Sequence, residues 1–139
     1  MGTRSLVGVM VGSKCRAVYV HWDGYLDGVG AGLQSYTTQK AVEELIAPGD
    51  RSSLEDGFYA DRGETGVDPT EYATFAEFLD AANGCGAEYY YIFKDGVWYC
   101  GDTYGKWGSN SRISGKLVTY VDAVAAEKLQ RAMEEEAPM

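Results

Sequence analysis

Two turn signals, each placed between two apolar runs, constrain the fold of this chain more than any other feature. Gly12-Ser13 separates residues 5–11 from residues 16–22, and glycine at the first turn position suits a two-residue hairpin loop. Asp95-Gly96 divides the aromatic stretch EYYYIFKDGVWYCG in the same way. Two hairpins of this kind predict a sheet whose hairpin strands run antiparallel.

The register of the first hairpin bears on function. If Gly12-Ser13 is the whole loop, Val11 pairs with Lys14, and counting outward sets Arg4 opposite His21. A four-residue loop shifts the pairing but leaves Arg4 and His21 on the same face, because side chains alternate along a strand with period two. Only a three-residue loop would separate them.

The next part of the chain predicts two helices. Residues 28–36 form a short helix entered through glycines. Thr37 or Thr38 can cap a second helix that runs to Ala47, where Pro48-Gly49 ends it. The loop-like residues 50–67 follow, and a loop of this length in a compact domain indicates either a functional role or mobility.

The C-terminal half predicts two further helices and one more strand. Asp68 caps a helix that begins with Pro69, and Glu71 closes a capping box. Residues 116–121 read as a strand, after which Asp122 caps the last helix. The expected buried face of that helix consists of Ala125, Leu129, Ala132 and Met133.

The resulting order of elements is ββ-αα-α-ββ-β-α, without repeats or a linker. It predicts a single α+β domain over residues 1–139, with an antiparallel sheet of about five strands and helices packed mainly on one face.

Composition excludes several classes of function. The net charge is −9 and the chain has 12 lysine and arginine residues, so direct nucleic-acid binding is disfavoured. Three cysteines form no CxxC pair or Cys/His cluster, which indicates reduced thiols in a cytoplasmic protein and no metal site. The first twelve residues are too short and glycine-rich for a membrane span or a secretory signal. We expect no cofactor and no membrane association.

The stretch HWDGYLDGVGAGL, residues 21–33, is the strongest candidate site. It holds the only histidine of the chain, and three glycines at every second position open the predicted helix. Free N–H groups at a helix start favour an anion, and glycine allows a phosphate to approach the backbone. Arg4 could contact the phosphate, and Trp22 or Tyr25 could stack on a base. The predicted ligand-binding residues are Thr3, Arg4, His21, Trp22, Asp23, Tyr25, Gly28, Gly30 and, on the charged loop, Arg62.

Each of these residues also has a structural alternative. The glycines could form a tight turn that packs closely on the sheet, and Arg4 could pair with Asp23. His21 could serve as a hydrogen-bonding strand residue. Catalysis by His21 would need a nucleophile, and Thr3 and Ser5 are expected on the opposite face of the sheet.

The segments MGTRS and HWDGYLDGVG together resemble a family of small uncharacterised proteins from bacteriophages and prophages. Those proteins open with Gly-Thr-Arg-Ser, run a strand hairpin into Asp-Gly-Tyr and continue into Gly-x-Gly. The resemblance covers about the first fifty residues and the aromatic hairpin near residue 90. Leu26 stands where the family pattern has proline, which leaves the turn after Tyr25 less rigid. The resemblance implies a phage context and transfers no activity.

The candidate site predicts a protein that binds a small anionic, nucleotide-like molecule without cleaving it. The phage context that the resemblance implies adds, by analogy with other small phage proteins, the expectation of an anti-defence protein that sequesters a signalling molecule of this kind. The alternatives are an enzyme that modifies such a nucleotide through His21, and an acidic inhibitor of a host defence protein. We also expect a homodimer, in which an uncovered sheet face or a rim of Tyr89, Tyr91 and Trp107 pairs with its copy.

Overall fold

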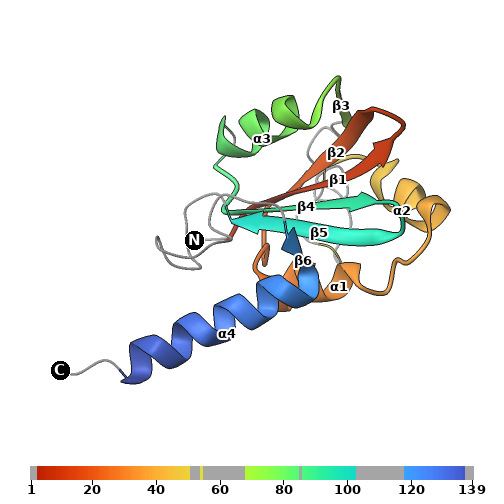
Figure 1. The fold of residues 1–139 in the computed structure, drawn as a ribbon. Helices are drawn as coiled ribbons and strands as arrows, with labels where there is room; N and C mark the ends of the chain where they lie inside the picture. The colour runs from red at the N-terminus through yellow and green to blue at the C-terminus, as the bar shows by residue number, and fades with distance from the viewer. Residues whose placement is uncertain (1–2, 51–53, 55–67, 85, 103–117, 137–139) are drawn as a thin grey trace.

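The fold is an α+β arrangement built on one mixed sheet, seen in a computed structural model that describes residues 3–50, 54, 68–84, 86–102 and 118–136. In these residues the sheet has six strands in the order β3-β2-β1-β4-β5-β6 (Figure 1). Their bounds are β1 Ser5–Val11, β2 Lys14–Val20, β3 Thr70–Tyr72, β4 Tyr89–Lys94, β5 Val97–Asp102 and β6 Val118–Thr119.

Both hairpins have the expected two-residue loops. In the first, Val11 pairs with Lys14 and Ser5 with Val20, which is the register of the shorter loop. Gly12 has a φ of +67°, a left-handed conformation that glycine adopts without strain. In the second, Lys94 pairs with Val97, and the Phe93 and Trp98 rings meet edge to face with centroids 5.2 Å apart.

The centre of the sheet departs from the purely antiparallel prediction. β1 and β4 are neighbours and run parallel, with Ser5 opposite Tyr89 and Val9 opposite Phe93. The two hairpins therefore join through their first strands. The local turn signals could establish the pairing inside each hairpin, whereas the pairing between hairpins depends on contacts far apart in the sequence.

Most of the helical structure packs on one face of the sheet. A π-helical turn η1 (Leu26–Gly30) leads into the single turn α1 (Ala31–Leu33), and α2 (Gln39–Ile46) follows. The N-terminal part of α4 (Tyr120–Glu136) covers the same face. The largest side chains of this core are Val7, Val9, Val18, Val20, Leu26, Val29, Leu33, Val42, Leu45, Ile46, Tyr89, Tyr91, Phe93 and Trp98.

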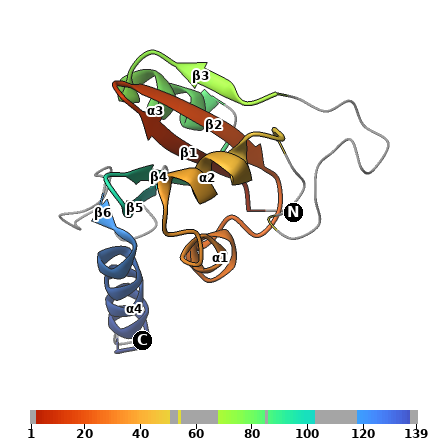
Figure 2. The ribbon, with the colours of Figure 1, turned by 90° about the vertical axis from the view of Figure 1, so that its right-hand side faces the viewer.

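The second face is covered as well, by α3 (Phe75–Gly84), so it is not an open aromatic surface (Figure 2). Phe78 of α3 is fully buried and meets Tyr90 of β4 edge to face, with centroids 6.1 Å apart. The smaller core on this face consists of Leu6, Cys15, Ala17, Phe78, Ala82, Ala87, Tyr90 and Ile92. Of the rim expected for a dimer, Tyr89 and Tyr91 are buried on the first face, and Trp107 lies outside the described residues.

Helices α3 and α4 both begin at residues other than those that the sequence predicts. Thr70 and Glu71 belong to β3, and α3 begins later, where the Thr74 hydroxyl accepts from the Glu77 N–H at 3.2 Å. The Glu77 carboxylate in turn accepts from the Ala73 N–H at 2.9 Å. The Thr-x-x-Glu pattern at Thr74 was the operative helix signal, because Pro69 precedes a strand at the sheet edge, where its missing N–H costs nothing.

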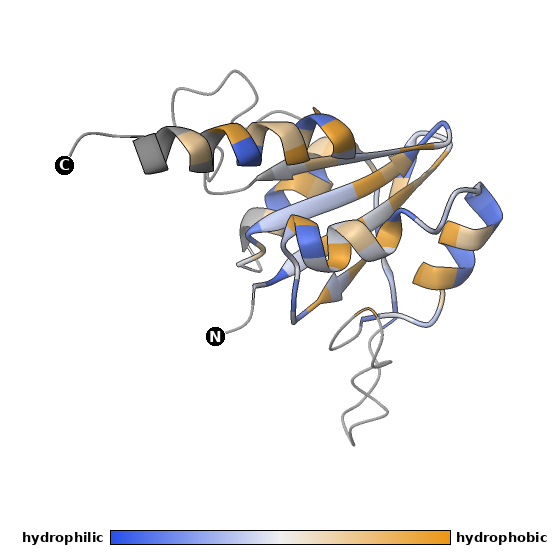
Figure 3. Ribbon diagram, turned by 90° about the horizontal axis from the view of Figure 1, so that it is seen from below, coloured by the Kyte–Doolittle hydropathy of each residue, from blue (hydrophilic) through white to orange (hydrophobic). Residues whose placement is uncertain are grey.

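The last helix begins two residues before the predicted cap. The Thr119 hydroxyl accepts from the Asp122 N–H at 3.3 Å, so Thr119 takes the capping role. Ala123 is buried, whereas Ala125, Leu129 and Ala132 of the predicted buried face are exposed. Helix α4 extends away from the sheet (Figure 1), and the part of it that Figure 3 colours by hydropathy carries both hydrophobic and hydrophilic residues.

By contrast, the second helix matches its prediction. Thr38 caps α2, and its hydroxyl accepts from the Ala41 N–H at 3.1 Å. No helix in the described part of the chain combines the length and apolar character needed to cross a bilayer.

Candidate functional site

The glycine stretch that the sequence singles out is a tightly hydrogen-bonded turn. The Gly28 and Gly30 N–H groups both donate to the Tyr25 carbonyl, and the Val29 N–H donates to the Asp23 carbonyl at 2.7 Å. These three N–H groups therefore have backbone partners. An anion nest made by Gly28, Val29 and Gly30 is not formed, and the packing alternative describes this turn better.

The glycines are needed because other groups lie too close for side chains. A Cβ at Gly28 would clash with the Asp23 carbonyl oxygen, and one at Gly30 would lie 3.0 Å from the Tyr120 ring and 3.1 Å from the Tyr91 ring. The Tyr91 hydroxyl donates to the Gly24 carbonyl at 2.7 Å, and the Tyr120 hydroxyl donates to the Leu26 carbonyl at 3.1 Å. Two tyrosines thus hold the turn against the sheet.

The single histidine lies at the end of β2, within a small aromatic group. His21 Nδ1 and the Tyr19 hydroxyl are hydrogen-bonded at 3.0 Å. The Trp22 ring meets the imidazole edge to face, with centroids 4.6 Å apart, and is itself exposed. The pairing of Ser5 with Val20 puts Ser5 on the other face of the sheet from His21, so this serine is not placed as its nucleophile.

The remaining predicted residues surround the same turn without forming one site. The Thr3 carbonyl accepts from the Gly24 N–H at 2.8 Å. Asp23 has a left-handed φ of +60°, and its carboxylate accepts from the exposed Tyr25 hydroxyl at 3.2 Å. That hydrogen bond and the nearby Asp23 charge raise the pKa of Tyr25. Arg62 lies outside the described residues.

Arg4 is exposed, and its guanidinium lies beside Gly86, 3.3 Å from the position of a Cβ there. The observed pairing ends with Ser5 opposite Val20, so Arg4 and His21 lie one position beyond the paired strands. In the described part of the chain the ion pair found is between Lys14 and Glu71, at 3.3 Å, and the alternative pairing of Arg4 with Asp23 is not found there.

Cys15 and Cys100 are both buried. Burial raises the pKa of Cys15 and of Cys100 to about 12, so neither supplies a thiolate nucleophile at neutral pH. The described residues contain no group of three or more His, Cys, Asp or Glu side chains that could hold a metal ion.

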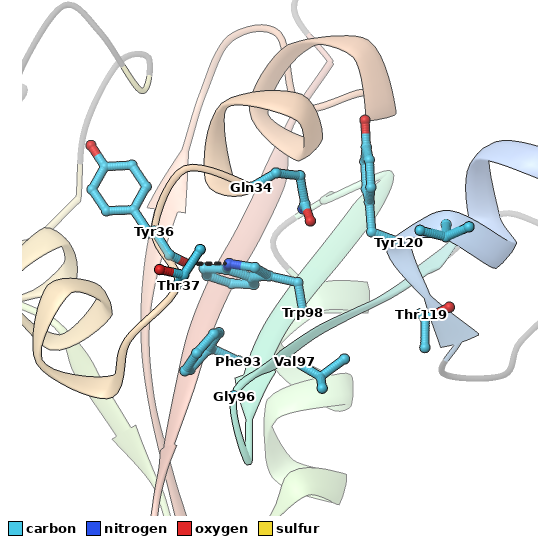
Figure 4. A pocket seen from close by; sticks show the side chains of 10 residues that line it. Gln34, Tyr36, Thr37, Phe93, Gly96, Val97, Trp98, Thr119 and Tyr120 are labelled. Atoms are coloured by element: carbon cyan, nitrogen blue, oxygen red, sulfur yellow. Dashed lines mark hydrogen bonds between the residues drawn. The ribbon is translucent and has the colours of Figure 1, made fainter.

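A pocket of about 210 Å³ lies where the α1–α2 connection meets the second hairpin and the start of α4 (Figure 4). The Trp98 indole lies at its centre, and its Nε1 donates to the Tyr36 carbonyl at 2.9 Å. Gln34 points toward the space between Trp98 and Tyr120. The lining residues are Gln34, Tyr36, Thr37, Phe93, Gly96, Val97, Trp98, Thr119, Tyr120 and Val121.

The polar groups of this pocket are neutral. The Gln34 amide nitrogen donates to the Gly30 carbonyl at 3.0 Å, which leaves the side-chain oxygen as an acceptor. Thr37 and Thr119 add hydroxyl groups, and no lining residue carries a charge. Sequence reasoning missed this pocket because its walls come from three separate segments. The one usable signal was the concentration of aromatic residues in the hairpin at Asp95-Gly96.

Comparison with known proteins gives no family model, no curated protein and no solved structure that matches this chain.

Proposed function

We propose that this protein binds a small nucleotide-like molecule through its planar base, in the pocket around Trp98. The supporting observation is the lining of that pocket, which joins aromatic rings to neutral hydrogen-bonding groups. A heterocyclic base offers a flat face for stacking and edge groups for hydrogen bonds, so it suits such a lining better than a bare anion does.

The size and charge of the pocket indicate which part of a nucleotide it would hold. A volume of about 210 Å³ is small for a ligand pocket and suits one ring system. No lining residue is charged and the net charge of the chain is −9. The phosphate part of a ligand would therefore stay at the open side, in solvent, and each added phosphate should weaken binding rather than strengthen it.

Titration calorimetry with a nucleoside and its mono- and triphosphate tests this ranking. We expect the nucleoside to bind at least as tightly as the monophosphate, and the triphosphate to bind most weakly. A triphosphate that binds most tightly would contradict the proposal and would indicate a binding site that contains cationic residues.

A matched pair of variants locates the site. Gln34→Leu removes the acceptor from the pocket, whereas Gln39→Leu removes a glutamine that donates to the Met10 carbonyl at 2.9 Å, away from the pocket. Loss of a buried hydrogen bond to the ligand should cost about 1 kcal/mol, or roughly fivefold in affinity. Gln39→Leu should bind as the unchanged protein does.

In its biological setting, we propose that the protein acts in the cytoplasm of a bacterial host, as a phage factor that sequesters a nucleotide signal of the defence system. The resemblance of the first fifty residues to phage proteins supports this setting. The alternative is an enzyme that acts through His21. Ligand recovered after incubation and heat denaturation distinguishes them, because sequestration returns it unchanged and an enzyme returns product.

We further propose that the protein is a homodimer. Because Tyr89 and Tyr91 are buried, the pairing surface we favour is the exposed apolar side of α4.

A further inference from the structure

A second pocket, of about 320 Å³, lies on the opposite face of the sheet, beside α3. Its lining comes from β1, β2, β3 and α3, together with the segment that follows α2. The lining residues are Leu6, Ala17, Tyr19, Asp50, Thr70, Tyr72 and Ala81. Asp50 is the one charged side chain among them.

Asp50 is positioned by the turn that ends α2. The Gly49 N–H donates to the Ile46 carbonyl at 2.9 Å, and Gly49 has a left-handed φ of +104°. The Asp50 Oδ1 atom then accepts from the Tyr19 N–H at 2.8 Å. β3 pairs with β2 only from Cys15 to Ala17, so Asp50 supplies a partner for a backbone group just beyond the end of that pairing.

The one hydrogen bond found within the described residues uses only part of the accepting capacity of this carboxylate. Oδ1 accepts one N–H, and a carboxylate offers about four acceptor positions. Desolvation by burial raises the pKa of Asp50, although the hydrogen bond from Tyr19 works in the other direction. No ion pair to Asp50 is found among the described residues. Among the described residues this half-buried negative charge therefore has no counter-ion, which is unfavourable, and a bound cation would correct this.

The other walls determine what kind of cation fits. Tyr19 and Tyr72 line the pocket together with Leu6, Ala17 and Ala81, so most residues that share the lining with Asp50 are aromatic or apolar. Metal ions of the hard kind need several oxygen ligands, and one carboxylate does not supply them. Aromatic faces attract organic ammonium groups, whose alkyl parts can also pack on apolar side chains.

We propose that this pocket binds a small organic cation of the alkylammonium type, with Asp50 as its counter-ion and the rings of Tyr19 and Tyr72 beside it. The site is separate from the Trp98 pocket and does not depend on the function proposed for that pocket.

Amide NMR gives a direct readout, because the Tyr19 N–H is hydrogen-bonded to the carboxylate in question. The probe is tetramethylammonium, and tert-butanol of similar size and no charge is the matched ligand control. We expect tetramethylammonium to shift the Tyr19 amide resonance in a saturable manner, and tert-butanol to leave it nearly unchanged.

Charge variants separate this site from general attraction to an acidic protein. Asp50→Asn keeps an oxygen that can accept from the Tyr19 N–H and removes the charge. Asp95→Asn removes one charge at the exposed turn between β4 and β5 and serves as the control. We expect Asp50→Asn to weaken tetramethylammonium binding by about tenfold or more and Asp95→Asn to have little effect.

Equal affinity in the two charge variants, or equal shifts from tert-butanol, would overturn the proposal. Should Asp50→Asn fail to fold, Tyr72→Leu decides instead, since it keeps the carboxylate and removes one ring. Weaker binding of tetramethylammonium by Tyr72→Leu supports the site, and unchanged binding rejects it.

Discussion

Gly30 lies directly against Tyr91. A Cβ built on Gly30 would lie 3.1 Å from both the ring edge and the hydroxyl oxygen of Tyr91, and 3.0 Å from the Tyr120 ring on the other side. Neither ring is free to withdraw, because each hydroxyl is hydrogen-bonded to a carbonyl of the turn it holds. The glycines after His21 thus allow a backbone turn to pack against two anchored tyrosines.

Gly30→Ala should therefore lower the free energy of unfolding by about 1–3 kcal/mol, as overpacking of a filled core does. Chemical denaturation followed by circular dichroism measures the loss. Gly84→Ala is the matched control, since a Cβ at Gly84 meets nothing within 4 Å. It should be neutral or slightly stabilising, and equal losses in the two variants would contradict the packing role of Gly30.

We also predict that the Tyr91 hydroxyl contributes to the stability of the protein. Tyr91→Phe removes the donor to the buried Gly24 carbonyl and should destabilise the protein by about 1–3 kcal/mol. Tyr25→Phe removes a hydroxyl whose bond to Asp23 is exposed, and its effect should stay within about 0.5 kcal/mol. Thermal melts of the two variants compare them directly. A Tyr91→Phe variant as stable as Tyr25→Phe would show that the turn does not depend on this bond.

The sequence correctly predicted those features of the fold that depend on residues close together in the chain, namely hairpin turns and a helix start. Gly12-Ser13 and Asp95-Gly96 predicted both hairpins, and the observed register of the first is that of the shorter of the two loops considered. Of the two candidate caps Thr37 and Thr38, Thr38 starts α2. These features depend on turn geometry and capping within a few residues. The parallel pairing of β1 with β4 joins residues more than eighty positions apart, and no local signal encodes it.

The candidate site was less predictable, because a pattern of glycines has two physical uses. Spacing alone could not decide whether Gly28 and Gly30 admit a ligand or a neighbouring side chain. The answer depends on Tyr91 and Tyr120, which the fold brings from β4 and α4. The Asp50 pocket was missed for a similar reason, since Asp50 reads as an ordinary loop residue until β3 stops short of Tyr19.

Asp50 should make stability depend on pH in a defined direction. Burial raises the folded-state pKa of Asp50 above its ordinary value, so folding favours the protonated carboxyl group. The resulting contribution to stability is present below the unfolded pKa and is lost as pH rises through the folded-state pKa. Asp50→Asn removes this titration.

The stability of Asp50→Asn relative to the unchanged protein should therefore increase between about pH 2.5 and about pH 7. Urea denaturation of both proteins across this interval measures the difference. The comparison is made without organic cations, which would supply the missing counter-charge. If the stability of Asp50→Asn relative to the unchanged protein falls as pH rises, folding favours the charged carboxylate and the prediction is wrong.

We predict that two copies of the protein pair through the exposed apolar side of α4. Val121 is 74% exposed and Leu129 is 62% exposed, and with Ala125 and Ala132 they recur at the spacing of one helix face. The helix has acidic residues and no basic residue in its last turn, next to its own negative dipole end. An antiparallel second copy would place the positive N-terminal end of its α4 beside those acids while covering the apolar side.

Sedimentation velocity from low to high micromolar concentration should accordingly reveal a dimer. Leu129→Lys should shift the protein toward monomer, because it puts a charge at the centre of the paired surface. Val11→Lys is the control, since Val11 is 45% exposed at the far end of the first hairpin and lies away from α4.

The orientation of the two helices is tested by disulfide formation in a background that carries Cys85→Ser. Antiparallel pairing places Ala125 of one copy opposite Leu129 of the other, so a mixture of Ala125→Cys and Leu129→Cys should form the mixed disulfide faster than either variant alone. A monomer at every concentration, or a dimer that survives Leu129→Lys unchanged, would remove α4 as the pairing surface.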